Sequence, residues 1–119
     1  AGVDSQRAAG QVAMLLGRTW SGLGDSERAE ALYGRAAPLV DAGFGPGSAE
    51  AFELERLRAE ELGKKGDIDG AIAAFDALLR RHVESGDEYA LSAERVRLAQ
   101  AQVMQAKGEA DAALALLEQ

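Results

Sequence analysis

The chain has 119 residues, of which 47% are hydrophobic and 5% aromatic, and it carries a formal net charge of -7. A chain of this size suits one domain with its own core, while its excess of carboxylates argues against nucleic acid and anionic membranes as partners, since either would need a basic patch. Without cysteine it has no disulfide and no thiolate metal site, and no apolar run approaches the ~20 residues of a membrane span.

The first two helices are predicted from apolar residues at helical spacing, with glycines marking the turn between them. The first spans Asp4 to Ser21. The second begins after Asp25, a good N-cap, and runs to about Gly43. Pro38 lies inside the second helix and is expected to bend or weaken it, because proline has no backbone N–H. The inward face of the first helix is predicted to carry Val12, Leu15, Leu16 and Trp20.

Four further helices follow the Gly-Pro-Gly loop at residues 43–47. Their predicted N-caps are Ser48, Asp67 and Asp87, and the last helix begins at Glu109. No stretch alternates with period two over a strand length, so no sheet is expected. The approximate helix ranges are 48–64, 67–85, 87–108 and 109–119.

The chain also repeats itself at a fixed period of 42 residues. The dipeptides Gly24-Asp25, Gly66-Asp67 and Gly108-Glu109 are spaced by this period, and each opens a similar helical stretch. Such a period is typical of a solenoid, in which each unit packs only on its neighbours. The sequence therefore predicts an all-α solenoid of three antiparallel helix pairs in one domain, residues 1–119. The repeats lie at about 5–43, 48–86 and 87–119, the last truncated.

Each repeat resembles the tetratricopeptide repeat, whose first helix reads W-x2-L-G-x2-Y and whose second reads A-x3-F. The small positions of that motif are Gly17, Ala59 and Ala101 on the first helices and Ala29, Ala71 and Ala113 on the second; the bulky ones are Trp20, Leu62 and Met104. The 42-residue period and the LVDAGFGPG segment are similar to the kinesin-light-chain type. The resemblance implies a right-handed superhelix whose first helices line a concave groove for a partner peptide.

By register with that motif, twelve residues are candidate groove contacts. Among them Arg18, Arg56 and Arg95 are predicted to anchor an acidic or carboxylate-bearing segment. The alternative is a solvated face held by ion pairs along each helix. The twelve are Gln11, Met14, Arg18, Ser21, Glu53, Arg56, Glu60, Lys64, Arg95, Leu98, Gln102 and Gln105.

The sequence predicts no catalytic residue, no metal and no cofactor. Its single histidine, His82, has no second histidine with which to build a metal site, and it is expected at the surface, where its replacement by alanine would cost under about 0.5 kcal/mol. Trp20 is expected in the core, where replacement by alanine would cost about 3–5 kcal/mol. The neighbouring carboxylates Glu60 and Glu61 point about 100° apart on a helix, which argues against an acid–base pair.

These features together predict a non-catalytic, cytoplasmic interaction module, a scaffold that binds a peptide or protein segment. The alternative is a regulatory or ligand-sensing domain of a larger signalling enzyme or transcription regulator, and a third possibility is a structural dimerisation element. The surplus of arginine over lysine and the lack of an initiator methionine suggest a piece of a longer bacterial protein.

The last helix is apolar on more than one side, at Leu114, Leu116 and Leu117. An uncovered apolar stripe is an interaction surface. We expect either that a further helix of the parent protein covers it or that a second copy does, so that the chain self-associates weakly.

Overall fold

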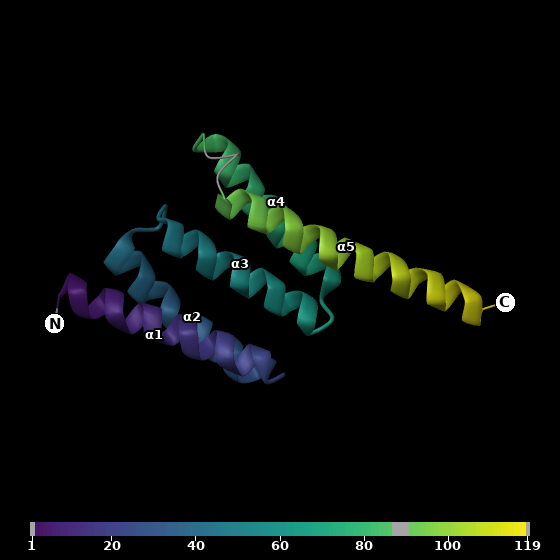
Figure 1. Cartoon of the computed structure of the whole chain (residues 1–119), viewed down its shortest axis with the longest axis horizontal. Coiled ribbons are helices and arrows are strands. Elements are labelled where there is room, and N and C mark those ends of the chain that lie inside the picture. The colour runs from purple at the N-terminus through teal and green to yellow at the C-terminus, as the bar shows by residue number, and fades with distance from the viewer. Residues whose placement is uncertain (1, 87–90, 119) are drawn as a thin grey trace.

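The structure, a computed structural model, describes residues 2–86 and 91–118. In these residues it is all-helical and contains no strand, which confirms the all-α part of the predicted fold. Its extents of 62 × 34 × 17 Å describe a long, thin molecule (Figure 1). The helices are α1 (Val3–Gly22), α2 (Ser26–Phe44), α3 (Ala49–Lys64), α4 (Ile68–Glu84) and α5 (Leu91–Leu117).

Three of the predicted N-caps hold the starts of their helices. The side chain of Asp25 accepts a hydrogen bond from the Arg28 amide, that of Ser48 from the Ala51 amide and that of Asp67 from the Gly70 amide. Each bond satisfies one of the amides that a helix start leaves unpaired. The fourth predicted cap, Asp87, lies outside the described residues. Pro38 is exposed, and α2 continues through it for a further six residues to Phe44.

The first two repeat glycines occupy equivalent turns. Gly24 and Gly66 have φ values of 84° and 95°, in the left-handed region that favours glycine. Directly after them, the amide of Asp25 donates to the Trp20 carbonyl and that of Asp67 to the Leu62 carbonyl, each at 2.9 Å. These are the six-to-one bonds of a helix-ending motif, so the 42-residue period is present in the backbone as well as in the sequence.

The third repeat does not turn. Gly108 lies within α5, which runs without interruption for 27 residues, so the prediction of a separate sixth helix from Glu109 is wrong and the third helix pair is not formed. The capping residue explains the difference. Where the first two turns have aspartate after the glycine, the third has glutamate, whose longer side chain is not a favoured N-cap. The alanines and leucines that follow are strong helix formers and extend α5 instead.

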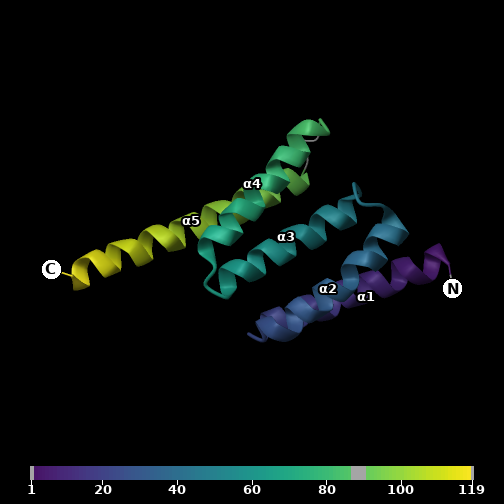
Figure 2. The same ribbon diagram turned by 180° about the vertical axis from the view of Figure 1, so that it is seen from behind.

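Neighbouring helices pack in chain order, and α3 lies between the α1–α2 pair and the α4–α5 pair (Figures 1 and 2). The first helix of each predicted repeat also touches the first helix of the next: α1 contacts α3, and α3 contacts α5. Among the described residues, α2 and α4 make no contact with each other. The odd-numbered helices therefore converge on one side of the molecule.

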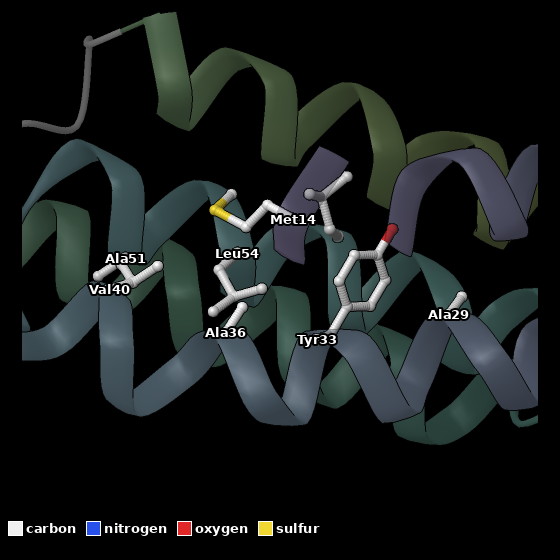
Figure 3. Close-up of a cluster of buried hydrophobic side chains, with 8 residues drawn as sticks. Met14, Ala29, Tyr33, Ala36, Val40, Ala51 and Leu54 are labelled. Carbon is white, nitrogen blue, oxygen red and sulfur yellow. The ribbon is translucent and has the colours of Figure 1, made fainter. Parts of the chain in front are cut away.

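Two separate clusters of buried side chains hold these helices together. The first joins the α1–α2 pair to α3, and Figure 3 shows Met14 of α1, Tyr33 of α2 and Leu54 of α3 meeting in it. The second joins the α3–α4 pair to α5 and includes Phe75, which is fully buried. Tyr33 and Phe75 are 42 residues apart, so the two clusters are repeats of one packing arrangement.

The crossing of α1 and α2 depends on glycine. A Cβ atom added to Gly17 of α1 would lie 2.5 Å from the Tyr33 ring, and one added to Gly10 would lie 3.1 Å from Val40. Side chains at these positions would push the two helices apart. Helix α1 therefore packs on α2 through its small residues and Met14, which is only 7% exposed.

This packing overturns the predicted inward face of α1. Val12, Leu15 and Leu16 are 54%, 61% and 45% exposed. The prediction followed the large apolar residues, whereas the helix turns its glycine face to α2. Trp20 is half-buried; it packs against the first cluster, and the Arg28 guanidinium lies 4.5 Å from its ring centroid.

The predicted surface position of His82 is also wrong. Its side chain is 1% exposed and stacks on Phe52 with 4.3 Å between ring centroids. The repeat explains this burial, since the residues 42 positions earlier are Val40 and Gly10, which touch each other in the first pair. In the second pair an aromatic stack replaces that aliphatic contact.

Candidate functional site

Among residues 2–86 and 91–118, three cavities lie between the odd-numbered helices. One of about 220 Å³ lies between α1 and α3 above Tyr33, and one of about 390 Å³ lies between α3 and α5 beside Gly63. A third of about 130 Å³ lies between α3 and α5 over His82. Helix α3 contributes residues to all three, so the cavities follow one another along it.

Most of the predicted groove contacts line these cavities. Eight of the twelve do so: Arg18, Ser21, Glu53, Arg56, Glu60, Lys64, Arg95 and Gln102. Met14 does not, because it is buried in the first cluster, and its prediction as an accessible groove contact is wrong. Gln11, Leu98 and Gln105 are exposed and line none of the three cavities.

A network of ion pairs crosses the face between α1 and α3. Arg56 lies 2.9 Å from Glu60 and 3.9 Å from Glu53, and Arg18 of α1 shares Glu53 at 3.9 Å. Arg56 is thereby held against α3 with its side chain 15% exposed, whereas that of Arg18 is 57% exposed. Arg95 of α5 is also exposed. The three predicted anchors are therefore not equivalent, because Arg56 is already paired on both sides.

A buried carboxylate forms one wall of the cavity between α1 and α3. Glu61 is 1% exposed, and its Oε2 accepts a hydrogen bond of 2.6 Å from the Ser21 hydroxyl, which in turn accepts one of 2.5 Å from the Lys64 ammonium. Within residues 2–86 and 91–118, Glu61 Oε1 has no hydrogen-bond partner. A buried acceptor without a donor is costly, so a donor entering this cavity gains more than it would at the surface.

The pKa of the Tyr33 hydroxyl group is raised by its burial beside Glu61 in this cavity. Burial and the nearby Glu61 carboxylate raise the pKa of Tyr33 to about 12, because both disfavour the negative phenolate. In the unfolded chain this pKa is about 10.

Stability should therefore fall between pH 10 and pH 12. Above pH 10 the unfolded chain releases the Tyr33 proton and the folded chain keeps it, so this tyrosine favours unfolding by up to ~2 kcal/mol as the pH rises. Tyr33→Phe should flatten the profile in that window and leave it unchanged below pH 9. Urea unfolding of both proteins across this range measures the difference. Parallel profiles would show that Tyr33 ionises as easily in the folded protein as in the unfolded one.

Sequence reasoning assigned neither Glu61 nor Tyr33 to this site. A signal for Glu61 was available, because it follows Leu54 and Leu57 at helical spacing and so falls on the buried stripe of α3. Its buried position distinguishes it from Glu60, with which the sequence analysis had grouped it.

No helix within the described residues is long and apolar enough to cross a membrane. Nor do these residues bring together three or more potential metal ligands. Comparison with protein-family models, curated proteins and solved structures found no match. The tetratricopeptide resemblance therefore rests on the repeat motif itself.

Proposed function

We propose that this chain is a non-catalytic interaction module of the tetratricopeptide type, which binds a protein segment along the face formed by α1, α3 and α5. One observation carries the proposal: the first helices of successive repeats touch one another while α2 and α4 do not. Convergence of the first helices is what the predicted superhelix requires of its concave side. A rigid, preformed face of this kind loses little conformational entropy when it binds.

The charges of the three cavities indicate what kind of segment fits. Although the chain has a net charge of -7, basic and acidic residues are equal in number around the cavities. A strongly acidic segment would meet four carboxylates, so the better match is a segment of mixed charge that pairs with both signs. The basic residues are Arg18, Arg56, Lys64 and Arg95, and the acidic ones are Glu50, Glu53, Glu60 and Glu61.

The cavity between α1 and α3 is the best candidate for the central contact. It combines the unpaired Glu61 Oε1 with Tyr33 on its floor, and its volume of about 220 Å³ admits a side chain or several waters. A partner amide or basic side chain that donates to Glu61 would pair this buried acceptor. Binding energy concentrates at such desolvated central contacts rather than at the exposed rim.

Synthetic peptides of three classes, net acidic, net basic and charge-balanced, provide the test. We expect the charge-balanced class to contain the tightest binders by fluorescence anisotropy. The double variant Arg18→Glu/Arg95→Glu should weaken the best binder about 10-fold or more, because both arginines are exposed at the cavities.

The matched control is Arg35→Glu/Arg80→Glu, which makes the same charge change at exposed arginines on α2 and α4. It should change the affinity less than about two-fold, as expected for charges distant from the bound segment. Equal losses in the two double variants would place binding elsewhere, and failure of all three peptide classes to bind would contradict the proposal.

A further inference from the structure

Helices α3 and α5 each pack on the preceding part of the chain through a stripe of buried apolar residues. Helix α1 has apolar residues at the equivalent positions, but there they are exposed. In α3 and α5 the residues that make this contact are at most 7% exposed: Leu54 and Leu57 on α3, Val96 and Ala99 on α5. Forty-two residues before Leu54 and Leu57 stand Val12 and Leu15, which are 54% and 61% exposed. No helix of the described residues covers this apolar stripe, and an exposed stripe of this kind is an interaction surface.

The C-terminal segment of α5 exposes the side chain that is equivalent, by the 42-residue repeat, to the residues that pack against these stripes. In the two clusters, Tyr33 and Phe75 are the second-helix side chains packed with those residues, and both are buried. The residue 42 positions after Phe75 is Leu117, which is 82% exposed. Leu114 and Leu116 beside it are also exposed. Because α5 does not turn at Gly108, this segment projects beyond the rest of the fold (Figure 1).

We propose that copies of this chain associate head to tail, with residues 109–117 of one copy packing across α1 of the next. Leu117 then contacts Val12 and Leu15 of the second copy. Within one chain, Phe75 packs in the same way in one cluster with Val96 and Ala99 of α5. The two surfaces match in length. Residues 109–117 rise about 12 Å along the helix axis, and the segment of α1 around Val12 and Leu15, from Ala9 to Leu16, rises about 10 Å.

Charge favours this pairing over a two-fold dimer. The segment 109–118 carries Glu109, Asp111 and Glu118 and no basic residue, whereas α1 carries Arg7 and Arg18 against one acidic residue, Asp4. Packing two α5 ends together would place six carboxylates in one contact, and packing two α1 helices together would collect like charges of the opposite sign. Only the contact between α5 and α1 joins surfaces of opposite sign.

This contact leaves one free end on each copy, so association continues beyond the dimer instead of closing. A single helix laid across another buries far less than the ~1,600 Å² of a standard stable interface, so each step is weak.

Sedimentation equilibrium of the whole 119-residue chain, from about 10 µM to about 1 mM, tests the proposal. The average mass should rise with concentration and pass that of a dimer. Leu15→Glu on α1 and Leu117→Glu on α5 should each lower the association constant about 10-fold or more, because each places a charge in the contact. An equimolar mixture of the two variants should recover association but stop at the dimer, since it contains one intact pair of surfaces.

Val83→Glu is the control, as Val83 is 53% exposed on α4 and belongs to neither surface; it should self-associate like the unchanged chain. Circular dichroism of each variant should show unchanged helix content, because all three positions are exposed. A chain that stays monomeric throughout would overturn the proposal. So would association retained by Leu15→Glu or by Leu117→Glu alone, which would indicate a two-fold contact between α5 ends or between α1 helices.

Discussion

Replacement of Phe75 by alanine should lower the free energy of unfolding by about 3–5 kcal/mol, the range for truncation of a buried aromatic residue. Phe75 is fully buried and connects α4 to α3 and α5 in the second cluster. Its removal leaves a cavity where three helices meet, and the buried α5 side chains of this cluster, Val96 and Ala99, are too small to fill it. A shift of roughly 10–20 °C in the melting temperature corresponds to a loss of this size.

Leu98→Ala provides the comparison, because Leu98 lies on α5 but is 62% exposed. It should change stability by less than about 0.5 kcal/mol, as most surface substitutions do. If Phe75→Ala leaves too little folded protein to measure, Phe75→Leu retains most of the volume and should cost about 1 kcal/mol. Similar losses at Phe75 and Leu98 would show that α5 does not pack on the second cluster.

Replacement of His82 by alanine should cost about 2–4 kcal/mol, several times the surface value expected from the sequence. The variant loses the stacking with Phe52 and opens space beneath it. Thermal unfolding measures the effect.

Val83→Ala is the matched control for this change, because it alters the next residue of the same helix at an exposed position. It should cost less than about 0.5 kcal/mol. If His82→Ala were equally mild, the burial of this histidine between α3 and α4 would be wrong.

The features that sequence reasoning predicted correctly are local ones. Asp25, Ser48 and Asp67 cap their helices through bonds to amides three residues away, and Gly24 and Gly66 end helices through their own backbone conformation. Such interactions depend on a few neighbouring residues and can be recognised in a sequence. The repeat also fixes the register of each helix, which is why eight of the twelve candidate groove residues line the cavities; their contact with a partner stays a prediction.

The features that it missed depend on what each helix packs against. The apolar residues of α1 were assigned to the core although its glycines face α2, and Met14 was assigned to the groove although it is buried. His82 is predicted at the surface, although the residue 42 positions earlier, Val40, is buried in the equivalent place. At Gly108 the repeat pattern predicted a turn, but the absence of an aspartate cap and the helix-forming residues that follow keep α5 continuous.

The order in which the helices touch also bears on how the chain folds. In the part of the chain that the structure describes, each helix contacts only helices one or two positions away in the sequence, so contacts link residues that are near one another along the chain. Low contact order of this kind is associated with folding in microseconds to milliseconds, because little loop entropy is lost before contacts form. Folding can begin in either helix pair and spread to its neighbour. Native-state hydrogen exchange should then show the α1–α2 pair and the segment from α3 to α5 opening as separate units.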